Sequence, residues 1–287
     1  MLKNVCYVNL KGGLGNQLFQ YYFAHNLKNL GKNVKIDTRF YHKHSKNSLD
    51  TPRLQLFNPS FFGFENTTIF ENIYKDNLEK LFYSRKIRKY IPHFSTSAFS
   101  HFNDNSKINY DNLPSVSVFN GYWQTIQDFV SCRNFFVNYL KKNEIFEKSY
   151  NSKKINGSTM IHIRRTDYIL LNQELKIDYY LNSINYLKEN IQNFSYTIFT
   201  DDYEWATQQN FSNDAKNIFS PFSFDNDFLS FCKMLEFENF VIANSTFSYV
   251  AALLGSNLNS KVLYPKTWFS NRNKNINFES FWIPIEN

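Results

Sequence analysis

The chain has 287 residues but few cysteines, and the three present, Cys6, Cys132 and Cys232, stand far apart. This odd number and wide spacing exclude a disulfide framework and the paired ligands of a zinc site. Cys6 and Cys232 lie among apolar residues, where we expect buried free thiols. The hydrophobic content of 43% is enough for the core of one large domain or of two medium ones.

The sequence also lacks an apolar run long enough to cross a bilayer. Its most apolar stretch, residues 240–254, is interrupted by Asn244, Ser245, Thr246 and Ser248. A transmembrane helix needs about 20 consecutive apolar residues, so this stretch is too short. No signal peptide precedes the first strand-like run. We therefore expect a cytoplasmic protein that at most contacts the inner face of the membrane.

Acidic residues are outnumbered by basic ones, which gives a formal net charge of +7. A basic protein can bind nucleic acid, an anionic membrane surface or an anionic substrate. The charge is spread along the chain, and its densest run, residues 85–89, is short and typical of a solvated helix face. We expect no nucleic-acid partner; an affinity that falls steeply with salt would favour one.

The first forty residues have the pattern of a β-loop-α-β unit. A strand over 5–10 leads into a glycine-rich loop at 11–17, then an amphipathic helix over 18–30 that Gly31 ends, and a strand over 34–37. Glycines let a ligand approach the backbone, and a helix N-terminus favours an anion. The loop matches neither a dinucleotide fingerprint nor a P-loop. A glycine turn without a ligand is the better explanation of this loop taken alone.

The middle of the chain carries weaker signals. Residues 38–115 contain a turn at 50–53, a candidate helix over 74–90 and a polar stretch at 95–114 that we expect to be a loop. We assign no chemistry to this part. A strand at 116–119 and a helix over 129–146 follow.

A polar linker at 148–158 is the best candidate for a domain boundary, which predicts domains at 1–150 and 151–287. Strands and helices alternate after it, at 160–163, 178–191, 196–199, 228–235, 240–243, 249–254 and 261–264. Such alternation is typical of a largely parallel α/β sheet. The chain is therefore predicted to form two Rossmann-type α/β domains.

Polar groups follow three of the predicted strands in the second domain. They are His162, Arg164, Arg165 and Asp167; then Asp201 and Asp202; then Ser245, Thr246 and Ser248. Parallel strands bring these ends to one edge, where nucleotides bind in such sheets. Two adjacent guanidiniums match phosphate oxygens, and Asp167 has the position to orient one of them. A structural Arg–Asp network without a ligand is the alternative.

One short pattern, Asp225-Asn226-Asp227, has the form of a metal-binding Asp-x-Asp. However, Asp227 begins a predicted helix and Asp225 lies in a turn. We therefore expect no metal and no other cofactor.

Four blocks in this order resemble the bacterial α-1,2-fucosyltransferases of glycosyltransferase family 11, which use GDP-fucose. They are Gly-Gly-Leu-Gly-Asn-Gln-Leu-Phe-Gln-Tyr (12–21), Gly-Tyr-Trp-Gln (121–124), His-Ile-Arg-Arg-Thr-Asp-Tyr (162–168) and Ile-Ala-Asn-Ser-Thr-Phe-Ser (242–248). The third block is shared with α-1,6- and protein-O-fucosyltransferases. The resemblance implies a GT-B-like pair of Rossmann-type domains, with an acceptor side in the first and the donor site in the second.

The chain departs from the family pattern at two places. Thr166 stands where the family usually has Gly, and Tyr249-Val250 where it usually has two Trp. These departures put details of acceptor choice in doubt, but not the donor.

The resemblance also implies roles for the donor site. Arg164 would hold the β-phosphate of GDP-fucose with Arg165 in support, and His162 with Asp201 or Asp202 would contact the guanine. The remaining donor-binding candidates are Gly15, Asn16, Gln17, Asn244, Ser245, Thr246 and Ser248.

The implied reaction is inverting transfer of L-fucose to the 2-hydroxyl of a terminal galactose, on an oligosaccharide or lipid-linked glycan. Acceptor-side candidates are Tyr122, Trp123, Gln124 and Glu174, and the candidates for a general base are Asp167 and Glu174. Two other classes stay open. A transferase for another nucleotide sugar would keep the arginines, whereas a non-catalytic glycan-binding protein would not need Arg164.

Overall fold

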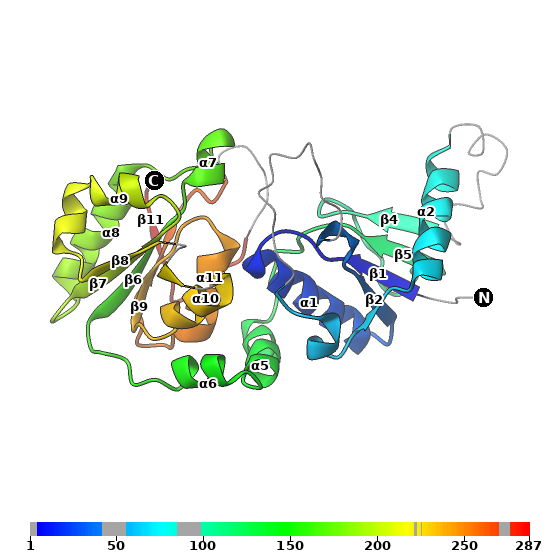
Figure 1. The fold of residues 1–287 in the computed structure, drawn as a ribbon, viewed down its shortest axis with the longest axis horizontal. Helices are drawn as coiled ribbons and strands as arrows, with labels where there is room; N and C mark the ends of the chain where they lie inside the picture. Colours follow the sequence, from blue (N-terminus) through cyan, green and yellow to red (C-terminus); the bar gives the residue numbers. More distant parts are fainter. Residues whose placement is uncertain (1–4, 42–55, 85–98, 221–222, 225, 270–275) are drawn as a thin grey trace. The chain divides into compact units, whose positions relative to one another are not determined.

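The computed structural model describes residues 5–41, 56–84, 99–220, 223–224, 226–269 and 276–287. The chain forms two compact units, Met1–Gln124 and Thr125–Asn287 (Figure 1). The turn expected at 50–53, the basic run at 85–89 and Asp225 lie outside the described residues. No helix in the described part of the chain is long and apolar enough to span a membrane.

The N-terminal unit is built on a five-stranded parallel sheet with the order β3-β2-β1-β5-β4. Its strands are β1 (Val5–Asn9), β2 (Asn33–Asp37), β3 (Glu65–Asn66), β4 (Phe99–Phe102) and β5 (Val116–Phe119). The helices are α1 (Leu14–Asn29) and α2 (Ile69–Tyr83), with 3-10 turns η1 (Arg39–Tyr41) and η2 (Pro59–Phe62). The predicted β-loop-α-β unit is confirmed.

Helices α1 and α2 cover opposite faces of this sheet. Val118 of β5 belongs to a cluster with Tyr7, against which Leu78 of α2 packs. The next residue, Phe119, faces the other way, and its ring lies 5.2 Å from that of Phe23 in α1. Successive strand residues point to opposite faces, which explains how one short strand serves both helices.

Gly31 ends α1, as the sequence predicts. Its φ of +72° is in the left-handed region that favours glycine. The Gly31 N–H donates to the carbonyl of Lys28 at 2.9 Å, and that of Lys32 to the carbonyl of Leu27 at 3.1 Å. These are the two bonds of a Schellman motif, which direct the chain into β2.

The C-terminal unit has a six-stranded parallel sheet with the order β11-β10-β9-β6-β7-β8. The strands are β6 (Ser158–Ile163), β7 (Ser195–Thr200), β8 (Asn217–Phe219), β9 (Asn239–Val241), β10 (Val262–Pro265) and β11 (Ile283–Ile285). The helices are α5 (Phe129–Leu140), α6 (Glu144–Tyr150), α7 (Thr166–Leu170), α8 (Ile177–Asn190), α9 (Tyr203–Thr207), η3 (Asn210–Asp214), α10 (Asp227–Met234) and α11 (Thr246–Gly255).

Both units are thus α/β with parallel sheets, which confirms the predicted GT-B-like class of two Rossmann-type domains. In the second unit, Ile161 and Ile163 of β6 pack with Tyr179 and Tyr180 of α8 in one core cluster. His162 between them points to the opposite face, which α10 and α11 cover (Figure 1).

The division between the units falls before α5, ahead of the linker at 148–158. Helix α5 packs against α11, and α6 against α10. The region expected as one helix over 129–146 is two helices, because the Asn143 side chain accepts hydrogen bonds from the N–H groups of Ile145 and Phe146 and starts α6.

Strands that the sequence did not indicate lie at the edges of the two sheets. They are β3 and β4 in the first sheet and β8 and β11 in the second. The loop expected at 95–114 is wrong over 99–102, where β4 forms. An edge strand pairs on one side only and these are two to four residues long, so they carry few apolar residues and little periodicity.

The two ends of the second unit meet at α11. Arg133 of α5 donates through Nε to the carbonyl of Leu253 at 2.8 Å, and its Nη2 lies 2.5 Å from Oε1 of Glu279. The Tyr249 hydroxyl donates to the carbonyl of Asn277 at 2.5 Å. We call this set of contacts the α11 clasp.

Candidate functional site

Arg164 lies just past the carboxyl end of β6, between two carboxylates. Its Nη2 is 2.7 Å from Oδ1 of Asp167, and its Nη1 is 3.1 Å from Oδ2 of Asp201. Strands β6 and β7 pair with Ile163 opposite Thr200, so the residues that follow them are neighbours. The structure therefore brings together the first two of the predicted polar groups.

Asp201 joins the arginine segment at three points. Its Oδ1 accepts from the backbone N–H of Arg165 at 2.8 Å, and its Oδ2 accepts from the Thr166 hydroxyl at 2.6 Å as well as pairing with Arg164. Glycine, the residue that is usual in the family at position 166, has no hydroxyl to make this bond. The departure therefore adds a contact inside the site.

Arg165 points to a different set of partners. Its Nε lies 3.1 Å from Oδ2 of Asp202, and its guanidinium carbon is 4.0 Å from the ring centre of Trp205. Asp202 also begins α9, because its Oδ1 accepts from the N–H of Trp205 at 3.1 Å. Stacked and paired in this way, Arg165 is held rigidly beside Arg164.

Three carboxylates thus face two guanidiniums at this edge of the sheet. Burial alone would lower the pKa of Arg164, but the charges of Asp201 and Asp167 outweigh it and raise that pKa. Arg164 therefore stays charged, and the carboxylates fix its planar fork in one orientation. A fixed, partly buried guanidinium is suited to bind a phosphate through two parallel bonds.

His162 lies on the α11 side of β6, with its ring 5.7 Å from that of Phe247. It is only 5% exposed, and burial, with a smaller effect from Arg164, lowers its pKa to about 3. The ring is therefore neutral at pH 7 and offers one donor and one acceptor. Its Nδ1 is buried and has no hydrogen-bond partner within the described residues. Such an atom is available to a polar group of a ligand.

The third polar group follows β9. Asn244 is buried, and its side-chain amide donates to the backbone carbonyl of Gln173 at 2.7 Å. The backbone carbonyl of Asn244 accepts from the Tyr168 hydroxyl at 3.1 Å. Tyr168 also lies against Arg164, 5.6 Å from ring centre to guanidinium carbon. The arginine segment and the end of β9 are therefore one connected structure.

The other predicted residues of this group form the start of α11. Ser245 caps the helix by accepting from the N–H of Phe247 at 3.4 Å, and the Ser248 hydroxyl donates to the carbonyl of Ser245 at 3.3 Å. Thr246 is half-buried in the first turn. The serine hydroxyls thus shape the helix N-terminus at this edge.

In the N-terminal unit, the glycine loop is held from inside. Gly12 has a φ of +81°, and a Cβ there would lie 2.7 Å from Nδ2 of Asn16. The buried Gln17 donates to the Gly12 carbonyl at 3.1 Å and accepts from the N–H of Leu56 at 3.1 Å. Gly15 is buried in the first turn of α1. Gln17 therefore has a structural partner on both sides.

The glycine loop meets the predicted acceptor segment of the same unit. Nε2 of Gln124 donates to Oδ1 of Asn16 at 2.8 Å. Gln20, fully buried, accepts from the N–H of Lys11 and donates to the carbonyl of Gly121, both at 2.9 Å. Two segments far apart in the sequence are thus joined by amide side chains.

Trp123 adopts a φ of +53°, which is unusual for a residue with a bulky side chain. Oδ1 of Asp104 accepts from the N–H groups of Tyr122 and Trp123, at 2.9 and 2.8 Å, and so fixes this turn. The Trp123 ring stacks on Phe23 with 4.3 Å between ring centres. Backbone strain of this kind is concentrated at functional sites.

Glu174 is exposed between α7 and α8, in the same unit as the arginines.

Tyr249 and Val250 are fully buried, and Tyr249 packs against Trp268, Phe278 and Trp282. The departure from two Trp therefore falls on residues of the core.

Sequence reasoning missed Gln20, Asp104, Tyr168 and Trp205. Gln20 and Tyr168 lie within the blocks 12–21 and 162–168 that carry the resemblance. Their membership of these blocks is the signal that could have found them. Asp104 lies in a polar stretch where nothing marks one carboxylate among several polar residues.

Among the described residues no group of three or more His, Cys, Asp or Glu side chains is arranged to hold a metal.

The sequence matches the model of the family "Glycosyl transferase family 11" over residues 5–286. It is 28% identical to an α-1,2-colitosyltransferase of Escherichia coli, with 99% of each chain covered. It is 27% identical to the O-antigen biosynthesis glycosyltransferase WbnK of Escherichia coli, with 97% of this chain and 100% of the relative covered.

Solved structures show weaker similarity. The fucosyltransferase NodZ from Bradyrhizobium matches with a TM-score of 0.44 and 13% identity, over 88% of this chain and 94% of that one. The ADP-heptose heptosyltransferase II of Escherichia coli matches with a TM-score of 0.43 and 9% identity, over 98% and 89%.

Proposed function

The chain belongs to glycosyl transferase family 11, and from this premise we propose that it is an inverting α-1,2-fucosyltransferase. The donor is GDP-β-L-fucose, and the acceptor is the 2-hydroxyl of a terminal galactose on an oligosaccharide or lipid-linked glycan. The observation that carries the proposal is the position of Arg164, fixed by Asp167 and Asp201 at the carboxyl edge of a parallel sheet.

The donor is proposed to bind the C-terminal unit. Arg164 donates to the β-phosphate, Arg165 supports it from its stack on Trp205, and the neutral His162 directs its ring nitrogen to the guanine. The start of α11, with Asn244, Ser245, Thr246 and Ser248, contributes donors to phosphate or ribose.

In the proposed reaction, the galactose O2 attacks the anomeric carbon of fucose while the bond from that carbon to the β-phosphate oxygen breaks. The electron pair leaves with GDP, and the proton of the 2-hydroxyl passes to a base or to solvent. Arg164 stabilises the charge that develops on the leaving oxygen, and this lowers the barrier more than it strengthens substrate binding. Asp167, already bonded to Arg164, orients the guanidinium; Glu174 is the candidate base.

One observation favours a second donor. The relative named α-1,2-colitosyltransferase is 28% identical over 99% of this chain. Colitose is L-fucose without its 3-hydroxyl, so a GDP-colitose donor would need the same phosphate and guanine contacts and a different sugar pocket. The acceptor segment, Tyr122, Trp123 and Gln124, is proposed to serve either donor.

The test is a donor panel with the purified chain: GDP-fucose, GDP-colitose, GDP-mannose, UDP-galactose and ADP-heptose, each with lactose as acceptor. Turnover with GDP-fucose, and an NMR spectrum that shows an α1,2 linkage to galactose, is the expected result. Faster turnover with GDP-colitose would favour the second donor. Turnover only with UDP or ADP sugars would contradict both, and glycan binding without any turnover would indicate a non-catalytic protein.

A further inference from the structure

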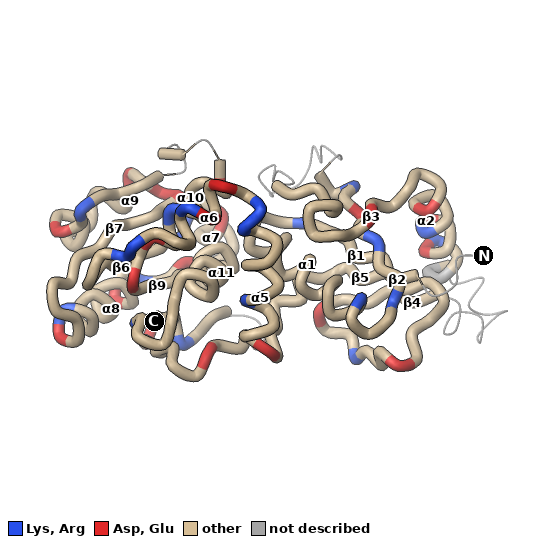
Figure 2. Tube along the Cα trace, turned by 90° about the horizontal axis from the view of Figure 1, so that it is seen from below, with Lys and Arg blue, Asp and Glu red and all other residues tan. Residues whose placement is uncertain are grey.

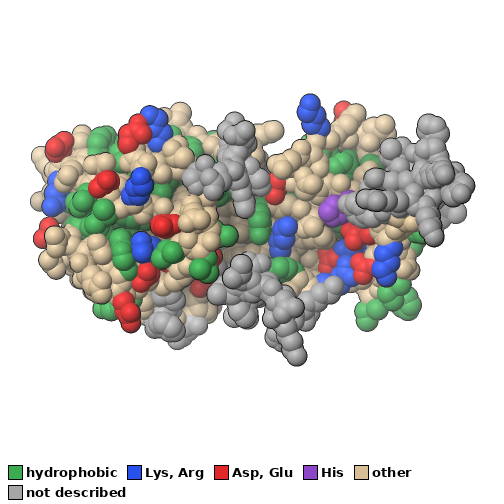
Figure 3. Space-filling view, turned by 90° about the horizontal axis from the view of Figure 1, so that it is seen from above, with side chains coloured by type: hydrophobic (Ala, Val, Ile, Leu, Met, Phe, Trp, Pro, Cys, Tyr) green, Lys and Arg blue, Asp and Glu red, His purple; other side chains and the backbone are tan. Residues whose placement is uncertain are grey.

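Helix α2 exposes a row of large apolar side chains to solvent. Ile69 is 77% exposed and Phe70 84%, and Ile73, Tyr74 and Leu81 are each about half exposed at 54%, 46% and 45%. With 3.6 residues per turn, these positions fall within an arc of about 140° on one side of the helix. Apolar side chains protrude from this end of the N-terminal unit beside a group of charged ones (Figure 3).

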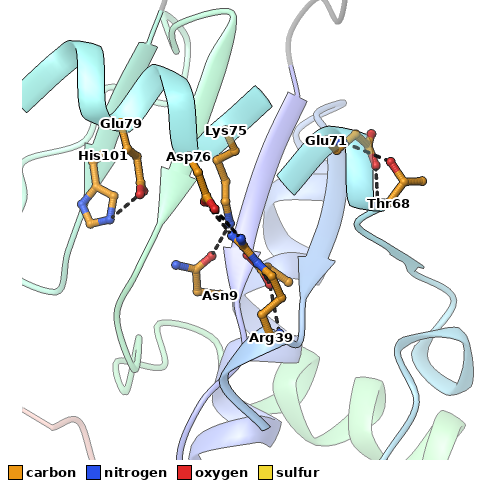
Figure 4. A network of polar contacts seen from close by, with 9 residues as sticks. Asn9, Arg39, Thr68, Glu71, Lys75, Asp76, Glu79 and His101 are labelled. Atoms are coloured by element: carbon orange, nitrogen blue, oxygen red, sulfur yellow. Dashed lines mark hydrogen bonds and ion pairs between the residues drawn. The ribbon is translucent and has the colours of Figure 1, made fainter. Parts of the chain in front are cut away.

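The side of α2 that faces the sheet combines one apolar residue, Leu78, with several charged ones. Lys75 is 1% exposed, and its ammonium contacts the carboxylate of Asp37 and, at 3.3 Å, Oδ1 of Asn9. The next residue, Asp76, pairs with Arg39 at 2.7 Å. Figure 4 shows these side chains extending from α2 toward the strands. Charged groups thus hold the helix to the domain where a surface helix normally buries apolar residues.

The usual amphipathic arrangement is therefore partly reversed in α2. Acidic and basic positions recur along the helix (Figure 2), and the buried ones among them, Glu71 and Lys75, are paired within the unit. Among the described residues of the unit, none covers this apolar face, since its side chains are 45–84% exposed. Four of the exposed apolar residues, Ile69, Phe70, Ile73 and Tyr74, lie close together in the first two turns, and an exposed apolar patch of this kind marks a binding surface.

The helix is formed before anything binds. Thr68 caps it by accepting from the N–H of Glu71 at 3.2 Å, and the Glu71 side chain accepts from the N–H of Thr68 at 2.8 Å. This capping box fixes the first turn, so a partner meets a rigid apolar face and no folding accompanies binding.

The formal charge of the N-terminal unit indicates what kind of partner the α2 face would meet. Residues 1–124 contain 16 Lys and Arg against eight Asp and Glu, a net charge of +8, whereas residues 125–287 contain 16 against 17, a net of −1. The whole basic excess of the chain thus belongs to the unit that carries α2. A preformed amphipathic helix on a basic domain is suited to an anionic lipid surface, into which the apolar side chains insert.

A second copy of the chain fits less well. Two N-terminal units that met through α2 would bring two charges of +8 together, and like charges oppose association. Another exposed apolar group lies at Leu170 and Leu171, but it belongs to the unit with a net charge of −1, close in sequence to the arginine site. We propose that the outer face of α2 docks the N-terminal unit onto an anionic phospholipid membrane.

The experiment is vesicle flotation of the full chain with phosphatidylcholine vesicles, with or without phosphatidylglycerol. We compare the wild type with a Phe70→Glu, Ile73→Glu double variant. A matched double variant, Val130→Glu with Leu258→Glu, changes two exposed apolar residues of the other unit, at 66% and 83% exposure, and adds the same charge. Circular dichroism melts verify that all three proteins fold.

The wild type and the matched variant should float with the phosphatidylglycerol vesicles, and the α2 variant should bind at least about ten-fold less. Binding that is equal for all three proteins, or absent in the wild type, would overturn the proposal. Concentration-dependent dimers that the α2 variant abolishes would also overturn it, in favour of a second copy. Lipid binding is measured without donor or acceptor, so the result does not depend on the proposed reaction.

Discussion

Arg164 and Asp201 come from the ends of neighbouring strands and meet with 3.1 Å between Nη1 and Oδ2. Their contact follows from the register of β6 and β7, in which Ile163 lies opposite Thr200 and the next residue of each strand forms the ion pair. The candidate phosphate site is thus determined by strand pairing rather than by a flexible loop.

Arg164→Ala should reduce kcat by about 10²–10³-fold or more, because it removes the group proposed to stabilise charge on the leaving phosphate. Arg164→Lys should restore little, since a point charge cannot reproduce the planar fork. Steady-state kinetics with the active donor measure both. GDP affinity should weaken less than turnover does.

Arg165→Ala is the matched control for this prediction. Its partners, Asp202 and Trp205, are structural, so its loss should lower the melting temperature or donor affinity more than the chemical step. Near-normal turnover in a folded Arg164→Ala protein would contradict the proposed role of Arg164.

Asp201→Asn and Asp202→Asn test the carboxylates that the arginines use. If one of them contacts guanine, its substitution should weaken GDP binding by roughly 1–3 kcal/mol and narrow the preference over ADP, because a buried polar group loses its partner. Isothermal titration with both nucleotides gives the comparison. Unchanged GDP affinity in both variants would remove this pair from the base site and leave them as partners of Arg164 and Arg165.

His162 should make stability depend on pH. Its pKa is about 3 in the folded protein, below the ordinary value near 6.5, so between these values only the unfolded chain takes up the proton. The free energy of unfolding should therefore fall by up to about 1.4 kcal/mol per pH unit as pH drops below 6.5. Urea unfolding of the wild type and His162→Gln at pH 8, 7, 6 and 5 isolates this contribution.

Above pH 7 the difference in unfolding free energy between the wild type and His162→Gln should be constant. The reason is that the His162 imidazole is neutral there in both the folded and the unfolded chain. A difference that also stays constant from pH 7 to 5 would show that His162 takes up a proton in the folded protein as easily as in the unfolded chain.

Asp104→Ala should loosen the acceptor segment. It removes the acceptor of two backbone N–H groups and should cost roughly 1–3 kcal/mol of stability. The KM for the acceptor should rise more than the KM for the donor. Asp104→Asn keeps an oxygen in place and should rescue most of both losses. Equal KM values for the acceptor in all three proteins would separate this turn from acceptor binding.

Activity should survive EDTA, since two guanidiniums are proposed to do what a metal ion would do for the leaving phosphate. Turnover measured before and after chelation, with and without added Mg²⁺ or Mn²⁺, makes the comparison. Activity that is lost on chelation and restored by either ion would contradict this prediction and would indicate a metal site that includes Asp227.

The sequence allowed the central strands to be predicted because β1, β5, β6 and β9 are almost wholly buried and are rich in apolar residues. The edge strands carried a weaker signal, and in β4 two polar residues separate Phe99 from Phe102. The division before α5 was not visible either, since the amphipathic pattern of a helix does not say which sheet it covers.

For the site, the strand-end clusters predicted that Arg164, Asp201 and Ser245 lie at the same edge, because parallel strands share one edge. Their exact partners were not predictable. The turn at Trp123 depends on Asp104, and the glycine loop on Gln20. Both are contacts between separate segments that leave no periodicity in the sequence.

The α11 clasp gives the last residues of the chain a part in the arginine edge. Arg133 binds both the carbonyl of Leu253 in α11 and the carboxylate of Glu279, and Tyr249 of α11 binds the carbonyl of Asn277. The first turn of the same helix lies at the arginine edge. Residues near the C-terminus therefore support that edge from the far end of α11, so a truncation that removed Asn277 and Glu279 would act on the site without touching any residue in it.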